Sequence, residues 1–404
     1  MNAGGLLSVE EAQNRVLALA PQMRTEQLAA GEALGRYLAE DLVARRTQPP
    51  TALSAMDGYA FGGDGPGPWR LVGESRAGAP FEAVLGAGEA VRISTGAHVP
   101  GGADRVLIQE DARVDDDMVS CIDDLPPALR HVRPRGFDFA EGELVLKAGT
   151  RVGAAQLALA LTAGHSTLAV RSAPRVAVLD SGDELAPDPS ACGPHQVPAS
   201  NGAMIGAMLV ALGCKVLRLG PVPDDVEALS AALAQAESVD ILVTTGGASV
   251  GDHDLIRPAL ERWGAQIGFW KVAMKPGKPI LVATRAGTAG NQVIFGLPGN
   301  PVSSFVTCFL FVLPLVRAAL GAATPLPLRA MLPTSATFPP VGKRREFLRA
   351  VWDGNGVLPA ASQDSSALAS LAAANCLVDR PADADAIEAG TYVPVLLLGN
   401  GGIA

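Results

Sequence analysis

The sequence predicts a multidomain α/β plus β protein. We expect a central three-layer α/β domain, a β-rich inserted domain, a discontinuous helical N-terminal domain and a small C-terminal β-barrel-like domain. Length is the first reason, because 404 residues exceed one ordinary domain. The second is the alternation of strand-like and helix-like segments between about residues 174 and 322. The third is the short, turn-punctuated segments on either side, in a chain with 45 glycines and 31 prolines.

The N-terminal region predicts helices followed by short strands. Apolar residues recur at helical spacing over residues 8–42, and Ser8 with Glu11 forms a capping-box pattern. Glycine and proline then punctuate residues 46–138, where the segments alternate as strands do. The clearest of these strand-like segments are 69–72, 90–93 and 105–108.

A second helical segment, 154–163, has no domain-sized core of its own and is expected to pack with the first helices. The β-rich region between them is then an insertion. We therefore predict a discontinuous N-terminal domain formed by residues 1–45 and 139–173, around an inserted β-rich domain of residues 46–138.

The central region, 174–322, has the rhythm of a mostly parallel sheet with helices on both faces. Its expected strands are 175–180, 215–219, 240–244, 279–283 and 293–295. Its expected helices are 201–212, 225–236, 255–263 and 302–320. A proline-rich linker then leads into the C-terminal β domain, 323–404. Its expected strands are 347–352, 357–359 and 392–398.

Composition excludes several functional classes. A net charge of −9 argues against nucleic acid as the main partner. The five cysteines are scattered and form no CxxC pair, which favours reduced thiols in the cytoplasm over disulfides or zinc. No signal peptide is visible at the N-terminus. The most apolar stretch, 305–320, contains Pro314 and Arg317, so we expect a buried helix and no contact with a membrane.

The segment 243–254 (VTTGGASVGDHD) is the strongest local signal. It joins a strand to a helix through glycines, an arrangement in which backbone N–H groups converge on an anion such as phosphate. Hydroxyl groups of Thr244, Thr245 and Ser249 add possible donors. Asp252 and Asp254 follow, and acids beside a phosphate site favour a bridging cation such as Mg²⁺. The alternative is a tight connection with Asp252 as a helix cap.

Acidic residues follow two other strands of the predicted sheet, where ligands of such sheets collect. The first strand ends in Asp180-Ser181-Gly182-Asp183-Glu184, and the second continues into Asp224-Asp225. A second tight loop, 297–304 (LPGNPVSS), opens the last helix. Together they suit a phosphorylated ligand bridged by a metal, although Asp224 or Asp225 alone would serve as an ordinary helix cap.

Three lysines, Lys271, Lys275 and Lys278, lie within eight residues in the segment KVAMKPGK. In so acidic a protein they suit an oxyanion or phosphate clamp, and a solvated turn is the alternative. Loops of the β-rich region carry Asp57, Thr95 and Asp138, which by themselves are explained equally well as loop residues. No Ser/His/Asp array or histidine pair with metal-ligand spacing supports a hydrolase or a zinc enzyme.

Seven motifs in order resemble the molybdopterin molybdenumtransferases, the family of bacterial MoeA proteins and the gephyrin E domain. They are SAMDGYA from residue 54, STGA from 94, RPRGFD from 133, SGDEL from 181, TTGGASVGDHD from 244, the lysine segment and LPGNPVS. The resemblance covers nearly the whole chain. It implies that the α/β domain binds molybdopterin, and that an elongated homodimer joins the α/β domain of one subunit to the β-rich domain of the other.

The resemblance also implies roles for residues that match the motifs. Catalytic roles across the subunit interface fall to Asp57, Thr95, Asp138, Glu184, Lys271 and Lys275. Substrate phosphate would lie against Ser181, Gly182, Asp183, Thr244, Thr245, Gly246, Gly247, Ser249, Pro298, Gly299, Asn300 and Pro301. Mg²⁺ would be held by Asp183, Glu184, Asp224 and Asp254. Molybdate would be held by Lys278, Ser303, Arg344 and Ser365 or Ser366.

The reaction implied is insertion of molybdenum from molybdate into adenylylated molybdopterin, with Mg²⁺-assisted release of AMP, to form molybdenum cofactor. Transient contacts with other cofactor-biosynthesis proteins would accompany it. Two alternatives remain. One is a non-catalytic molybdopterin-binding or scaffold protein of the same fold, which would need an extra partner-binding segment. The other is an adenylyltransferase acting one step earlier, which shares the TTGG loop but lacks the KPGKP and SAMDGYA motifs.

Overall fold

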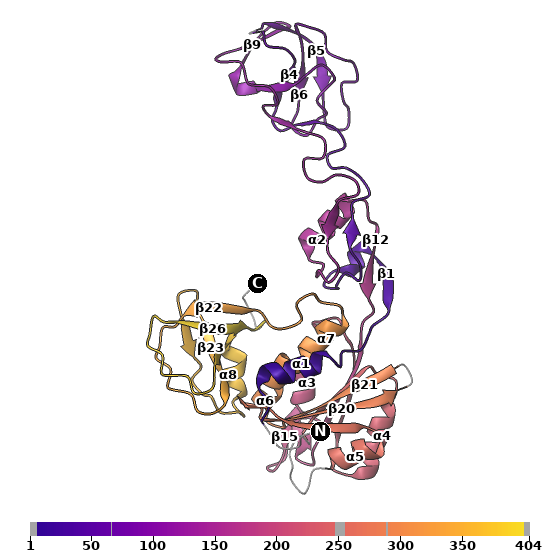
Figure 1. Ribbon diagram of the computed structural model, residues 1–404, viewed down its shortest axis with the longest axis vertical. Helices are drawn as coiled ribbons and strands as arrows, with labels where there is room; N and C mark the ends of the chain where they lie inside the picture. The colour runs from indigo at the N-terminus through magenta and orange to yellow at the C-terminus, as the bar shows by residue number, and fades with distance from the viewer. Residues whose placement is uncertain (1–5, 66, 247–254, 288–289, 400–404) are drawn as a thin grey trace.

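The computed structural model describes residues 6–65, 67–246, 255–287 and 290–399. Figure 1 shows an elongated molecule. The α/β unit and the C-terminal β unit lie side by side at one end, a small unit occupies the middle, and the inserted β-rich unit stands at the far end. The predicted fold class is confirmed, whereas the predicted domain boundaries stay predictions.

The first helix, α1 (Val9–Leu17), begins at Ser8, whose hydroxyl accepts a hydrogen bond from the Glu11 N–H at 3.0 Å. Its buried face joins the core of the α/β unit, and the Gln13 amide donates to the Leu310 carbonyl at 3.1 Å. The helix predicted over 8–42 is therefore wrong beyond Leu17. Pro21 follows closely, and proline cannot donate the hydrogen bond that a continuing helix needs.

The middle unit is formed by segments from both sides of the insertion. Strand β1 (Thr25–Ala29) pairs antiparallel with β12 (Thr167–Arg171), and β2 (Leu42–Val43) pairs with β11 (Leu144–Leu146). The unit also contains the 3-10 helix η1 (Ala30–Ala33) and helix α2 (Ala154–Thr162). The apolar residues between 28 and 38 that suggested a helix fill a small core beneath α2.

The inserted unit is a six-stranded sheet in the order β7-β4-β6-β5-β9-β8. Its strands are β4 (Gly58–Phe61), β5 (Trp69–Ser75), β6 (Glu89–Ile93), β7 (Arg105–Ile108), β8 (Ala112–Asp115) and β9 (Met118–Cys121). A short 3-10 helix η2 (Gln109–Asp111) and the pair β3 (Leu53–Ser54) with β10 (Val132–Arg133) complete it. The three strands predicted here are confirmed. Phe61 stacks on Trp69 in the core, with ring centroids 3.9 Å apart.

The α/β unit contains a six-stranded sheet in the order β16-β13-β17-β21-β20-β18. The strands are β13 (Arg175–Ser181), β16 (Lys215–Val222), β17 (Ile241–Thr245), β18 (Gln266–Lys271), β20 (Pro279–Gly287) and β21 (Gly290–Leu297). The four adjacent strands β16, β13, β17 and β21 run parallel to one another. Strand β20 lies between β21 and β18 and runs antiparallel to both. Short segments η3 (Pro189–Ala191), β14 (Leu185–Ala186) and β15 (Val197–Pro198) lie outside the sheet. The mostly parallel sheet is confirmed, and β18 is an addition.

Helices cover both faces of this sheet, as predicted. One face packs against α3 (Asn201–Val210) and a long helix, and the other packs against α4 (Val226–Gln235) and α5 (Ile256–Arg262). The long helix consists of α6 (Pro301–Thr307), a π-helical turn (Cys308–Val312) and α7 (Leu313–Ala319). Over these 19 residues the mean hydropathy is 1.9, enough by length and composition for a membrane span, yet 89% of it is buried inside the protein.

The C-terminal unit is a sheet in the order β19-β23-β25-β26-β22, with β24 paired to β23. Its elements are β22 (Arg329–Pro333), β23 (Arg345–Trp352), β24 (Val357–Pro359), α8 (Leu368–Ala373), β25 (Cys376–Arg380) and β26 (Tyr392–Leu397). The three strands predicted here are confirmed. Strand β19 (Met274–Lys275) comes from the lysine segment of the α/β unit and pairs with the start of β23. The two units are therefore joined by backbone hydrogen bonds beside the lysines.

Truncating a side chain in the shared core tests this packing. Phe311 is fully buried among the long helix, α1 and the sheet. We expect Phe311→Ala to lower the free energy of unfolding by roughly 3–5 kcal/mol, because it removes buried apolar contacts and leaves a cavity. Urea unfolding followed by circular dichroism measures this. Leu328→Ala, at a side chain that is 78% exposed, is the control. Equal losses in the two variants would contradict the packing described.

Candidate functional site

The carboxyl ends of three parallel strands meet at one edge of the α/β sheet. Asp180 lies opposite Thr245, and Thr245 lies opposite Leu297. The loops after β13, β17 and β21 therefore start side by side, as the sequence predicted for the acidic loop, the TTGG loop and the LPGNP loop. Gly246 has a φ of +89°, and a Cβ there would lie 3.0 Å from the Ser181 carbonyl oxygen. Any residue with a side chain would thus be strained at position 246, where the chain passes close to the Ser181 carbonyl.

Asp180 anchors this edge, and the sequence analysis did not select it as a site residue. Its carboxylate is 1% exposed; Oδ1 accepts the Thr245 hydroxyl at 2.5 Å, and Oδ2 pairs with Arg218 Nη2 at 3.1 Å. The Thr244 hydroxyl instead donates to the Phe295 carbonyl at 3.4 Å. Both threonine hydroxyls are thus engaged within the sheet edge. The only sequence signal for Asp180 was its position at the end of a buried strand.

A pocket of about 690 Å³ opens above this edge. Residues of the predicted site that line it are Glu184, Thr245, Gly299, Asn300 and Pro301. Helix α3 adds the Asn201 side chain, whose amide donates to the Gly299 carbonyl at 2.7 Å and so holds the LPGNP loop. Ser366 and Leu368 close the pocket from the C-terminal unit. It is large enough for a small organic ligand.

The predicted metal-binding acids lie beside this pocket. Asp224 Oδ1 accepts the Ser181 hydroxyl at 2.8 Å, and the Asp224 N–H donates to Asp183 Oδ1 at 3.1 Å. Asp225 instead caps α4, because its carboxylate accepts the Ala228 N–H at 2.8 Å. Within the described ranges, no three acidic, histidine or cysteine side chains gather closely enough to hold a metal.

The remaining members of the TTGG loop, Gly247, Ser249 and Asp254, lie outside the described residues, as does Asp252. Asp254 was one of the four predicted metal ligands, so the structure describes three of that set.

A second pocket, of about 310 Å³, lies where the lysine segment, α6 and the C-terminal unit meet. Lys275, Ser303, Arg344 and Ser365 line it, whereas Ser366 faces the larger pocket. Lys275 also pairs with Glu346 at 3.0 Å. The two pockets are neighbours, because Pro301 lines one and Ser303 the other within the same helix turn. Gly277 has a φ of +96°, and a Cβ added there would lie only 2.5 Å from Thr307 Cγ2. The chain can therefore pass this close to α6 only with glycine at this position.

Lys271 and Lys278 do not line this second pocket. Lys271 ends β18, and Lys278 precedes β20, so both are exposed at the same edge of the sheet. The Lys278 carbonyl accepts the Val272 N–H at 2.9 Å, which closes the turn between them. The structure thus separates the three lysines into one pocket member and two neighbours on the rim.

Arg349 is a pocket residue that the sequence analysis missed. Its guanidinium is fully buried, and Nη2 donates to the carbonyls of Ser362 at 2.8 Å and Asp364 at 3.0 Å. Burial lowers the pKa of this arginine. Gln363 reinforces the contact, since its amide exchanges two hydrogen bonds with the Arg349 backbone. Arg349 therefore holds the loop that presents Ser365, whose carbonyl accepts the Val302 N–H at 3.1 Å.

The predicted residues of the inserted unit lie far from both pockets within one chain (Figure 1). Asp57 and Thr95 do meet: Asp57 Oδ1 accepts the Thr95 N–H at 2.6 Å and the Thr95 hydroxyl at 2.8 Å. These hydrogen bonds hold the pKa of Asp57 below its usual range, and Arg92 adds to the effect. Asp138 is exposed in the connection to the middle unit. The structure therefore forms two separate groups of predicted site residues.

Comparisons with known proteins cover nearly the whole chain. Family models described as "MoeA N-terminal region (domain I and II)", "Probable molybdopterin binding domain" and "MoeA C-terminal region (domain IV)" match residues 7–164, 177–318 and 332–398. A molybdopterin molybdenumtransferase of Bacillus subtilis is 33% identical over 97% of this chain and 94% of its own length. One from Haemophilus influenzae is 34% identical over 78% of each chain.

Solved structures show the same arrangement of units. A molybdopterin biosynthesis MoeA protein from Pyrococcus horikosii has a TM-score of 0.76 at 29% identity, over 97% of this chain and 99% of that one. A second structure of such a protein, from Pyrococcus horikoshii OT3, has a TM-score of 0.83 at 24% identity, over 98% and 100% of the two chains, and shows likeness of fold.

Removing Arg349 tests its role in holding the loop. Arg349→Met leaves the carbonyls of Ser362 and Asp364 without their buried donor, which costs roughly 1–3 kcal/mol locally. We expect faster amide hydrogen exchange across residues 360–366. Arg113→Met, at an exposed arginine of the inserted unit, is the control. Unchanged exchange in this loop would show that Arg349 does not hold it.

The Asp57–Thr95 contact predicts a pH dependence with a definite sign. Because the folded-state pKa is lowered, the stabilisation from these bonds is fully present above the ordinary aspartate value of about 3.9. It is lost as the pH falls through the lowered folded-state pKa. Thr95→Val should raise this pKa only partly, because the Thr95 N–H remains. Carbon-13 NMR titration of the Asp57 carboxyl measures its pKa in the parent protein and in Thr95→Val. A pKa in the parent protein at or above the ordinary aspartate value of about 3.9 would contradict the geometry.

Proposed function

This chain belongs to the molybdopterin molybdenumtransferase family, and from that membership and its two adjoining pockets we propose that it inserts molybdenum from molybdate into adenylylated molybdopterin. The observation that carries the proposal is the contiguity of the pockets. Among the described lining residues, the larger pocket has mostly neutral groups with two acids, Asp180 and Glu184, and the smaller one combines basic side chains with hydroxyl groups. Molybdenum cofactor and AMP are the products.

The smaller pocket is proposed to bind molybdate. Lys275 and Arg344 supply positive charge, and Ser303 and Ser365 supply hydroxyl donors. A tetrahedral oxyanion is recognised by such a combination of charge-assisted and neutral hydrogen bonds. Arg349 orders the loop that carries Ser365. Lys271 and Lys278, exposed on the neighbouring rim, raise the local positive potential that draws in an anion.

The larger pocket is proposed to bind the pterin substrate and its adenylate. The loops at Gly182, Gly246 and Gly299 bring backbone groups close to a phosphate, as glycine permits. Asn300 and Pro301 line the same space. The dithiolene sulfurs of the substrate, close to the molybdate pocket, provide the nucleophile, so a reactive protein thiol is not needed. Burial raises the pKa of Cys214 to about 12 and of Cys376 to about 11, which leaves these thiols protonated.

The acids beside the larger pocket are proposed to hold Mg²⁺ together with substrate phosphate, because Mg²⁺ is usually bound by one or two carboxylates plus phosphate oxygens and does not need a cage of protein ligands. Asp183, Glu184 and Asp224 are exposed carboxylates, and in the part of the chain that the structure describes none of them forms an ion pair. Hard oxygen ligands of this kind are those that Mg²⁺ prefers. A bound Mg²⁺ would neutralise charge on the phosphates during cleavage of the adenylate. Asp254 follows the TTGG loop in sequence and is proposed to complete the set.

We further propose that the protein acts as a homodimer. Asp57 directly precedes β4 and Thr95 follows β6, in the unit at the far end of the molecule from the α/β and C-terminal units (Figure 1), so a second subunit is proposed to bring them, with Asp138, to the cleft. There the Asp57 carboxylate, kept ionised by Thr95, would face the lysines across the interface. The cytoplasm is the proposed location, because the cysteines are free, and other cofactor-biosynthesis proteins are the proposed transient partners.

Release of AMP from adenylylated molybdopterin tests the proposed function. With Mg²⁺ present, we expect release that depends on molybdate and falls at least about a hundredfold in Glu184→Ala, as for loss of an electrostatic catalytic group. Glu388→Ala, at an exposed acid of the C-terminal unit, is the matched control. Tight substrate binding without AMP release would identify a non-catalytic binding or scaffold protein. AMP release without any effect of molybdate would also contradict the proposal.

A further inference from the structure

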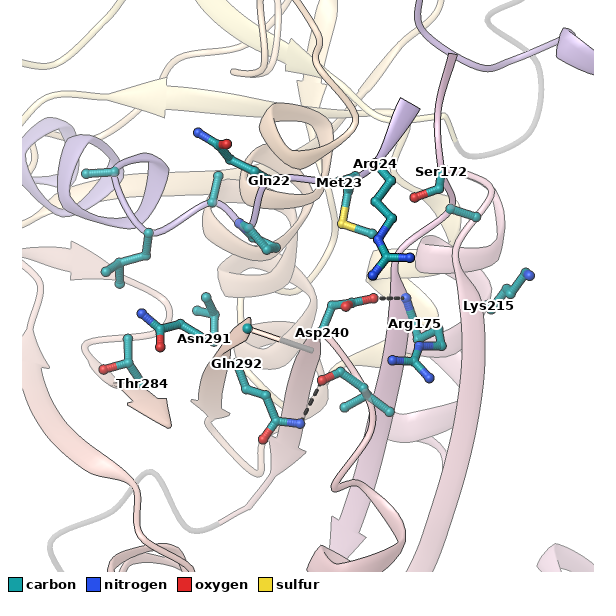
Figure 2. A pocket seen from close by; sticks show the side chains of 18 residues that line it. Gln22, Met23, Arg24, Ser172, Arg175, Lys215, Asp240, Thr284, Asn291 and Gln292 are labelled. Carbon is teal, nitrogen blue, oxygen red and sulfur yellow. Dashed lines mark hydrogen bonds between the residues drawn. The ribbon is translucent and has the colours of Figure 1, made fainter. Parts of the chain in front are cut away.

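A second large cavity, of about 700 Å³, lies at the opposite edge of the α/β sheet (Figure 2). Its floor is formed where β13, β16 and β17 begin, and one wall is the end of the β20–β21 hairpin. Residues 18–24 cover it, in the connection from α1 to β1. We call it the amino-edge cavity. It is as large as the pocket at the carboxyl edge, and the proposed function makes no use of it.

The amino-edge cavity lies beneath two connections between the α/β unit and the middle unit. The first is residues 18–24, and the second is residues 172–174, between β12 and β13. They are bonded to each other, because the Ser172 N–H donates to the Arg24 carbonyl at 2.7 Å and the Arg171 guanidinium donates to the Met23 carbonyl at 3.1 Å. A ligand in the cavity would thus contact the segments that set how the middle and inserted units are oriented.

Basic side chains from three distant segments gather at this cavity. Figure 2 shows Arg24 reaching down from the covering segment towards Asp240 and Arg175, with Lys215 at the rim. Within the described ranges, none of the three basic side chains has an ion-pair partner. Among the described lining residues Asp240 is the one acid, and its carboxylate already accepts the Arg175 backbone N–H at 2.7 Å. An excess of positive charge in a chain of net charge −9 favours an anionic ligand.

The rest of the lining offers neutral hydrogen-bonding groups. In the part of the chain that the structure describes, the side chains of Gln22, Ser172, Thr284 and Asn291 make no hydrogen bond within the protein. Gln292 differs, because its amide donates to three backbone carbonyls and its oxygen accepts from Arg285. Available hydroxyl and amide groups beside unpaired guanidinium groups suit an organic anion with a polar body better than a bare inorganic ion.

We propose that the amino-edge cavity binds a small, multiply charged organic anion of the phosphate-ester or polycarboxylate class. Arg24 holds it from the covering connection, and Arg175 and Lys215 hold it from the sheet. A bound anion therefore links the two connections to the sheet and restrains the segments that lead to the middle and inserted units. By linkage, any ligand that favours the same orientation of the units binds more tightly when the anion is present. This inference is independent of the proposed function.

Calorimetric titration of the full chain with fructose 1,6-bisphosphate, a phosphate ester, and with citrate, a polycarboxylate, tests the proposal. We expect one saturable site per chain, with a dissociation constant raised at least about tenfold in the double variant Arg24→Ala/Arg175→Ala, because charged hydrogen bonds are lost. The double variant Arg113→Ala/Arg262→Ala removes the same charge from exposed positions elsewhere and should bind as the parent does. Binding of fructose 1,6-bisphosphate alone would assign the phosphate-ester class, and binding of citrate alone would assign the polycarboxylate class.

The smaller pocket, lined by Lys275 and Arg344, is the competing location for these probes. The double variant Lys275→Ala/Arg344→Ala is therefore a further control, and it should bind the probes with the dissociation constant of the parent protein. Amide exchange of residues 18–24 should slow when the probe is bound. Three results would overturn the proposal: saturable binding of neither probe, binding lost only in the Lys275/Arg344 variant, or binding that leaves exchange of residues 18–24 unchanged.

Discussion

The register of the parallel strands β13, β17 and β21 determines where the loops of the site begin. It places Asp180, Thr245 and Leu297 in one row. All three site loops start from that row. A shift of one residue in the pairing of these strands would therefore move their buried side chains to the opposite face of the sheet. The Asp180 carboxylate reinforces the row by accepting the Thr245 hydroxyl while pairing with Arg218. The larger pocket is a direct consequence of this alignment.

A second consequence is the joining of two units at the smaller pocket. The lysine segment leaves the sheet, pairs as β19 with β23 of the C-terminal unit, and returns to β20. Lys275 from the α/β unit and Arg344 from the C-terminal unit are thereby brought to one space. Neither unit alone provides the pocket, which explains why its residues are spread over about ninety positions of the chain. The inserted unit, by contrast, remains at the far end of the molecule.

Much of this arrangement could be predicted from the sequence, because strand–helix alternation and turn motifs are local signals. Lys278, Ser303, Arg344 and Ser365 or Ser366 were grouped through the resemblance. The structure places Ser303, Arg344 and Ser365 in one pocket, whereas Lys278 does not line it and Ser366 lines the larger pocket. Other features depend on tertiary contacts that no local pattern records. The apolar residues near Leu28 and Leu38 have helical spacing, but they belong to strand β1 and the turns after it. Strand β1 pairs with β12, which lies more than a hundred residues later in the sequence. Arg349 resembles a surface residue of a strand until its burial is known.

We propose that a working site needs the pockets of one subunit and the Asp57 loop of another. Mixing Asp57→Ala with Lys275→Ala protein, after dissociation and reassociation, tests this most directly, with AMP release as the readout. Each variant alone should be inactive. The mixture should recover roughly a quarter of the parent rate, since about half of the dimers are mixed and each holds one intact cleft. A mixture that stays inactive, with mixed dimers shown to form, would rule out a site shared between subunits.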